Sequence, residues 1–148
     1  MARANRRIKK GGAGGPFLDS ALLCEQVICE HDGTYSAIRM INRITFHTEA
    51  PATGVMLMTP FWLLVSFKAG SFNGSQDLLI AIEDPSGRSY QPFHSLQIAF
   101  SGGDTGQVAL CQLMLRYDID GTYWIDILLN RKRFSRIPIS IAFDGQTS

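Results

Sequence analysis

The sequence lacks the residue patterns that usually mark a catalytic or metal-binding site. The three histidines are His31, His47 and His94, and no HExxH, His-x-His or paired-cysteine motif occurs. There is no Gly-x-Ser-x-Gly elbow, and no cysteine has a candidate base beside it in the sequence. We therefore expect neither catalytic residues nor a cofactor, and we predict that the protein is not an enzyme.

Cysteine is scarce, and its spacing argues against a disulfide framework. Cys24, Cys29 and Cys111 form no CxxC pair and have mostly apolar neighbours. This pattern predicts reduced, buried thiols and a cytoplasmic location. The sequence also leaves open a disulfide from Cys111 to either of the other two.

Long apolar runs are missing as well. The most apolar run, residues 55–67, is 13 residues long and contains Pro60, whereas a membrane-spanning helix needs about 20 apolar residues. The basic N-terminus is followed by Gly-Gly-Ala-Gly-Gly-Pro, where a signal peptide would need an apolar segment. We expect no membrane span and no signal peptide.

Charged residues make up only 18% of the chain, against 45% hydrophobic residues, and the basic ones are unevenly placed. Residues 1–16 carry five basic side chains and no acid, and their glycines oppose a helix. We predict a flexible, basic, Gly-rich arm over residues 1–16 and a single domain over residues 17–148. The arm is either a solubilising leader or a non-specific contact to nucleic acid or to an acidic surface. The candidates for this contact are Arg6, Arg7, Lys9 and Lys10.

What the sequence does contain is a series of short segments with apolar residues at every second position, the period of a half-buried strand. The clearest is the hairpin of residues 121–143, in which Tyr123, Ile125, Ile127 and Leu129 share one face. The predicted strands cover residues 21–30, 35–46, 55–67, 78–83, 93–100, 107–117, 123–129 and 134–143. Turn signals separate these segments at near-regular spacing. The pattern predicts an all-β, antiparallel, immunoglobulin-like β-sandwich of about eight strands.

Two of these strands support more specific expectations. Residues 21–30 are apolar on both faces, so this strand is central in its sheet or covered on its outer side. The strand over residues 35–46 is expected to place Ile38, Met40, Ile44 and Phe46 inward. Turn centres are predicted at Asp32-Gly33, at Asn73-Gly74 and at Asp84-Pro85-Ser86-Gly87.

Acidic loop residues are expected to gather at one end of the sandwich if every connection reverses the chain. A calcium ion bound by loop carboxylates is one hypothesis for this end, with Glu83, Asp84, Asp118 and Asp120 as candidate ligands. The competing interpretation, which we favour, is that these are turn residues that hydrogen-bond their own backbone. If every connection reverses the chain, the first strand also starts at the acidic end, and the basic arm would leave the domain from there.

Two further surface features are candidates for interaction. Arg131, Lys132 and Arg133 form a basic hairpin tip, which either resists edge-to-edge association or contacts a partner or nucleic acid electrostatically. Trp124 is predicted to point away from the core face of its strand. At this position Trp124 either forms half of a surface that binds a partner or is covered by a neighbouring loop.

Two stretches resemble a known family. The opening contains Leu23-Cys24-Glu25-Gln26-Val27, Asp32-Gly33 and Ser36-Ala37-Ile38-Arg39, and the close contains Gly121-Thr122-Tyr123-Trp124 and Arg136-Ile137-Pro138-Ile139. Together they resemble a family of short bacterial β-sandwich proteins, a domain of unknown function, over most of residues 20–143. The resemblance implies a fold and no activity. The closing Gly-x-Tyr strand is also similar to the late strands of immunoglobulin-like sandwiches.

These observations favour a non-catalytic, small bacterial β-sandwich module for protein–protein interaction or scaffolding, which binds a protein partner or self-associates. The alternative is a ligand-binding β-sandwich domain, dependent on calcium or carbohydrate, that uses the acidic loop end.

Overall fold

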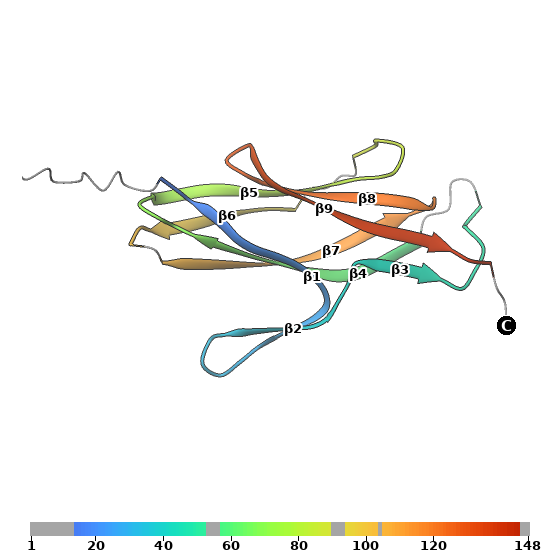
Figure 1. The fold of residues 1–148 in the computed structure, drawn as a ribbon, viewed down its shortest axis with the longest axis horizontal. Helices are drawn as coiled ribbons and strands as arrows, with labels where there is room; N and C mark the ends of the chain where they lie inside the picture. The colour runs from blue at the N-terminus through green and yellow to red at the C-terminus, as the bar shows by residue number, and fades with distance from the viewer. Residues whose placement is uncertain (1–13, 53–56, 90–93, 104, 146–148) are drawn as a thin grey trace, which may run out of the picture.

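The computed structural model is an all-β sandwich of two sheets (Figure 1). It describes residues 14–52, 57–89, 94–103 and 105–145, which contain nine strands. The first sheet has the order β2-β1-β4-β7, formed by β1 (Phe17–Cys29), β2 (Tyr35–Met40), β4 (Leu57–Lys68) and β7 (Gly106–Tyr117). The second has the order β3-β9-β8-β5-β6, formed by β3 (Arg43–Phe46), β5 (Asn73–Glu83), β6 (His94–Ser101), β8 (Gly121–Leu129) and β9 (Lys132–Phe143). The predicted all-β sandwich is confirmed, with one strand more than expected.

The core lies between the two sheets and is built from alternate residues of each strand. The predicted inward row of β8, from Tyr123 to Leu129, is buried throughout. The inward row of β4 is buried in the same core and consists of Phe61, Leu63, Val65 and Phe67. Aromatic pairs also join the sheets. The ring of Phe46 stacks on Tyr117 with 4.5 Å between centroids, and Phe67 meets Phe134 edge-on at 5.8 Å.

The prediction of one strand over residues 35–46 is wrong, because the chain forms two strands there in different sheets. β2 pairs with β1 in the first sheet. β3 pairs with β9 in the second sheet, and this pair is parallel, with Ile44 opposite Ile141. The sandwich is therefore antiparallel except at β3.

The crossing between the sheets lies at residues 39–42. Arg39 has a φ of 57°, which is uncommon for a residue with a side chain, and the Ile41 N–H donates to the Leu23 carbonyl at 2.8 Å. Met40 was predicted to point inward but is 68% exposed, whereas Ile41 packs against the core. Two successive apolar residues, Met40 and Ile41, break the period of two, and this is the signal in the sequence that marks the crossing.

The β1–β2 hairpin projects from the sandwich (Figure 1). β1 pairs with β4 as far as Cys24 opposite Trp62, and from Cys24 to Cys29 it pairs with β2 instead. The hairpin turns at Asp32-Gly33, as predicted, with the Thr34 N–H donating to Asp32 Oδ1 at 2.9 Å. β1 is thus central in its sheet over its first part and leaves β4 over its second.

The extra strand changes the end of the sandwich from which the N-terminal segment leaves. Phe17 opens β1 opposite Lys68, the last residue of β4. Gly15, Pro16 and Phe17 line a shallow hollow together with Asn130 and Lys132, at the tip of the β8–β9 hairpin. The arm therefore leaves beside the basic tip and not, as predicted, at the acidic end. The expectation failed because it counted one chain reversal too few before β4.

The two remaining turn predictions have different outcomes. The turn at residues 84–87 forms as expected, with the Gly87 N–H donating to the Asp84 carbonyl at 3.0 Å. The turn predicted at Asn73-Gly74 is wrong, because β5 already begins at Asn73. The chain turns earlier, where the Phe72 N–H donates to the Ala69 carbonyl at 3.0 Å.

Tyr123 forms a tyrosine corner, a feature of immunoglobulin-like sandwiches. Its ring is completely buried, and its hydroxyl donates to the Ile119 carbonyl at 3.0 Å. Burial raises the pKa of Tyr123, so the hydroxyl stays protonated and able to donate. The hydrogen bond fixes the loop before β8 to the strand that it enters.

Replacing Tyr123 by phenylalanine removes this hydrogen bond and leaves the Ile119 carbonyl without its donor. We expect the free energy of unfolding to fall by about 1 kcal/mol, measured by urea denaturation. The matched control is Tyr35→Phe on the exposed hairpin, which should change stability by less than about 0.5 kcal/mol. Equal effects of the two substitutions would contradict a structural role for the corner.

Candidate interaction surface

The outer face of the first sheet carries a second apolar cluster, separate from the core. Cys24 and Leu64 are buried but do not belong to the core cluster between the sheets. Strand register places them in two adjacent rows on the outer face, since paired residues of neighbouring strands share a side. The rows are Met40–Cys24–Trp62–Gln112 and Leu22–Leu64–Leu110. The next pairs along the strands are Pro60–Met114 and Ser66–Val108.

Exposed large hydrophobic residues are confined to this sheet in the part of the chain that the structure describes. Met114 is 48% exposed and Val108 is 41% exposed on β7, and Met40 is exposed on β2, at the opposite edge of the sheet. The others lie on β1 and β2: Phe17, Ile28 and Tyr35. Tyr35 lies in the alternate row of the hairpin, opposite Cys29, and the other five share the outer side of the sheet. Such concentration is unusual for a solvated surface, where apolar residues are scattered singly.

Charge is absent from the centre of this apolar face. Asp19, Lys68 and Arg116 lie toward the ends of their strands, and Glu25 and Arg39 form an ion pair at 3.2 Å in the alternate row of the hairpin. Strands lie about 4.8 Å apart and rise about 3.4 Å per residue, so β1, β4 and β7 over about seven residues cover about 340 Å² in projection. This is the size of the largest apolar patch on a typical monomer, which is often functional.

The outer face of the second sheet is charged instead. Trp124 points to this outer face, as predicted, in the same row as Glu83 and Pro138. The Arg136 guanidinium lies 5.0 Å from the centre of its ring, a cation–π contact, and pairs with Glu83 at 2.9 Å. Trp124 is therefore half-buried beneath an ion-pair network, and it offers less apolar surface than the first sheet does.

The basic hairpin tip is a tight two-residue turn. Asn130 and Arg131 have φ values of 49° and 68°, as a type I′ turn requires. Lys132 lies 5.5 Å from the centre of the Phe134 ring, and Arg133 pairs with Asp126 at 3.7 Å. The three predicted contact residues are exposed, but two of them also have partners within the domain. Arg6, Arg7, Lys9 and Lys10 of the arm lie outside the described residues.

At the acidic end, Asp84 is buried and organises the loop that follows β5. Its Oδ1 accepts from the N–H groups of Ser86 and Arg88 at 2.9 and 2.8 Å, and its Oδ2 accepts from Arg88 Nε at 2.7 Å. The same guanidinium lies 3.5 Å from Asp118. A calcium ion at Asp84 would have to displace this arginine.

The other predicted calcium ligands also have partners. Glu83 pairs with Arg136, and Asp120 accepts from the Phe143 N–H at 2.9 Å. Within the described ranges, no group of three or more histidine, cysteine or acidic side chains is arranged to hold a metal ion. The acidic residues do share one end of the sandwich, as expected, since Asp144 lies there too, 2.6 Å from His47.

Two cysteines are buried, as predicted, and one is not. All three thiols are free, with Cys24 and Cys111 buried and Cys29 exposed on the projecting hairpin. Burial raises the pKa of the Cys111 thiol to about 11, so it is protonated and unreactive at neutral pH.

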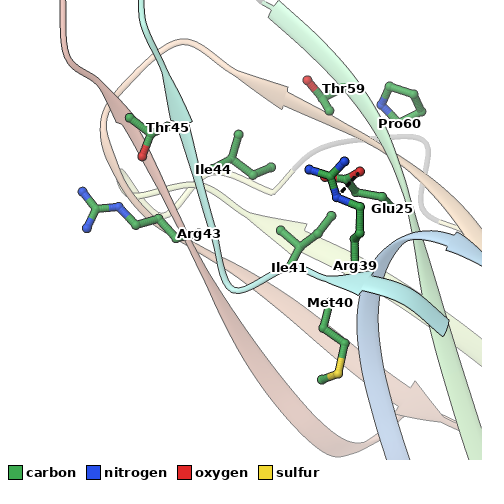
Figure 2. A pocket seen from close by; sticks show the side chains of 9 residues that line it. All are labelled: Glu25, Arg39, Met40, Ile41, Arg43, Ile44, Thr45, Thr59 and Pro60. Atoms are coloured by element: carbon green, nitrogen blue, oxygen red, sulfur yellow. Dashed lines mark ion pairs between the residues drawn. The ribbon is translucent and has the colours of Figure 1, made fainter.

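A hollow of about 590 Å³ opens where the hairpin leaves the sandwich (Figure 2). Glu25, Arg39, Met40 and Ile41 border it from the hairpin and the crossing. Arg43, Ile44 and Thr45 border it from β3, and Thr59 and Pro60 from β4. Sequence reasoning missed this hollow because it treated residues 35–46 as one strand, which would leave no gap between the sheets.

Comparison with known proteins gives structural likenesses only. No family model and no curated protein matches the chain. A Pyrococcus furiosus CARDB domain solved with two metal ions is 8% identical, with a TM-score of 0.43, over 86% of this chain and 96% of that one. An immunoglobulin-like protein from Pseudomonas aeruginosa is 12% identical, with a TM-score of 0.39, over 88% and 99%.

A third solved structure is an alkylpurine DNA glycosylase of Pseudomonas fluorescens bound to DNA with an abasic site analogue. It is 15% identical, with a TM-score of 0.41, and the match covers 68% of this chain but only 27% of the glycosylase. Scores this low carry no argument about function. Among the described residues, no helix is long and apolar enough to cross a membrane.

Replacing Asp84 by asparagine tests the organisation of the acidic end. The neutral side chain keeps an oxygen acceptor for the loop but loses the ionic hydrogen bond with Arg88, so we expect a loss of about 2 kcal/mol in the free energy of unfolding. Asp77→Asn, at an exposed carboxylate on β5, is the control and should be nearly neutral. A wild-type midpoint of thermal unfolding in the Asp84 variant would show that the loop is held by other contacts.

Proposed function

We propose that the protein is a non-catalytic β-sandwich module for protein–protein interaction, and that its binding surface is the outer face of the first sheet with the projecting hairpin. The observation that carries this proposal is the confinement of the exposed large hydrophobics to that sheet. Methionine side chains at two borders of the face, Met40 and Met114, are flexible and adapt to a facing surface.

The partner to which the proposal commits is a second copy of the chain. The face is neutral at its centre, so two copies can meet without repulsion between like charges, as an isologous two-fold contact requires. Two faces of about 340 Å² bury about 680 Å² in all, and the projecting hairpin adds to this total, which stays at the low end of specific interfaces, about 1,200 Å². An interface of this size implies weak, reversible association.

The test is the concentration dependence of sedimentation for the full chain and for a variant with lysines introduced into the face. We expect wild-type protein to dimerise with rising concentration, and Met40→Lys/Met114→Lys to remain monomeric, because lysine ammonium groups would be desolvated at the contact. Ser140→Lys, an exposed position on the other sheet, is the control and should associate like wild type. A chain that stays monomeric at every concentration, or a double variant that still dimerises, contradicts the proposal.

A further inference from the structure

We propose that the hollow beside β3 is a strand-addition site, which binds an extended peptide segment with alternating acidic and apolar residues. The site uses the edge of β3 in the second sheet and not the outer face of the first sheet, although Met40 and Pro60 border both. It depends on three properties of the described residues: a free strand edge, an apolar floor and an arginine without an ion partner.

β3 is the edge strand of the second sheet, and among the described residues one of its sides has no neighbouring strand. On the β9 side, the Asn42 carbonyl accepts from the Ser140 N–H at 3.3 Å and the Phe46 carbonyl accepts from the Asp144 N–H at 3.0 Å. Backbone groups of successive residues in a strand point to opposite sides, so Ile44 also faces β9. Arg43 and Thr45 therefore direct their N–H and C=O groups toward the hollow.

These four backbone groups have no hydrogen-bond partner among the described residues. β1 leaves β4 after Cys24, so this part of the β4 edge is not covered by β1. Among the described residues, no strand pairs with β3 on the side that faces this gap. The facing edge of β4 is the weaker place for a new strand, since Pro60 has no N–H to donate. A strand added along β3 would extend the second sheet by β-augmentation, with main-chain bonds giving affinity and side-chain positions giving specificity.

The side chains around the hollow specify the pattern of the added strand. Ile41 and Ile44 pack against the core and form an apolar floor (Figure 2). Every second residue of the added strand faces this floor and should be apolar. The residues between them face outward, beside Arg43 and Thr45, which share that side of β3.

The charges favour acidic residues at the outward positions. Arg39 is paired with Glu25, whereas Arg43 points away from that pair (Figure 2) and has no ion pair with any described residue. Its guanidinium is available to a carboxylate, and the Thr45 hydroxyl is exposed as a second donor. Residues 1–13 of the chain contain only basic charges and do not fit this pattern, so the occupant to which the proposal commits is an acidic, extended segment of a partner protein.

The experiment titrates the full chain with the blocked peptide acetyl-Glu-Val-Glu-Val-Glu-amide and follows backbone amide signals by NMR. We expect shifts at residues 43–46 and 59, and none at Met114 or Val108 on the outer face of the first sheet. The lysine counterpart, acetyl-Lys-Val-Lys-Val-Lys-amide, should bind at least about threefold more weakly, the range of an exposed ion pair. Equal binding of both peptides, or shifts confined to the outer face, would overturn the proposal.

N-methylated peptides test the main-chain bonds without changing the protein. In an added strand, only alternate N–H groups face β3. One peptide is methylated at the valine nitrogens and the other at the glutamate nitrogens, and we expect one of the two to lose binding while the other keeps it. An antiparallel strand places the glutamate N–H groups toward β3. If neither methylated peptide loses affinity, binding does not use the strand edge and the proposal fails.

Two matched substitutions test the protein side of the same bonds. Thr45→Pro removes an N–H that faces the hollow and not β9, so it should reduce affinity about fivefold or more, whereas Thr45→Ser, which keeps the N–H and the hydroxyl, should bind like wild type. Arg43→Gln should weaken binding of the glutamate peptide about threefold and should not weaken binding of the lysine peptide, because the substitution removes a like charge. These results are separate from the dimer test, since Met114→Lys, at a position outside the lining of the hollow, should still bind the peptide.

Discussion

The chain leaves the first sheet after Met40 and enters the second at Arg43, and the exposed features of the molecule depend on this crossing. The backbone reverses through Arg39, whose positive φ costs of the order of 1–3 kcal/mol, and the Ile41 N–H holds the crossing to Leu23. The crossing frees the hairpin to project, leaves part of the β4 edge without a neighbour and opens the hollow beside β3. It also sets the end of the sandwich from which the N-terminal segment leaves.

The two outer faces of the sandwich differ in polarity: one is charged, as a solvated surface is, and the other is apolar, as a contact surface is. On the second sheet, Trp124 is covered by Arg136, and the carboxylates nearby are paired. On the first sheet, Met40 and Met114 are exposed with no charge between them. An apolar face costs free energy in water in proportion to its area, so the asymmetry between the sheets supports docking on the first.

Much of the core was predictable from the sequence, because alternation along one strand is a local property. The buried row from Tyr123 to Leu129 follows directly from its period of two. The sheet change was not predicted, since Ile38, Met40, Ile44 and Phe46 keep the same phase on both sides of it, and the exception at Ile41 carried too little weight. The apolar outer face could not be predicted either, because its rows join residues from four strands whose order only the fold supplies.

Amide hydrogen exchange at β3, measured by NMR on the full chain, tests the central claim that this strand belongs to the second sheet and keeps one open edge. The account predicts alternation: the amides of Ile44 and Phe46, which face β9, exchange slowly, and those of Arg43 and Thr45, which face the hollow, exchange rapidly. Slow exchange at all four residues would mean that another segment covers the edge. Rapid exchange at all four would mean that β3 does not pair with β9. The first result would contradict the open edge, and the second would contradict the crossing into the second sheet.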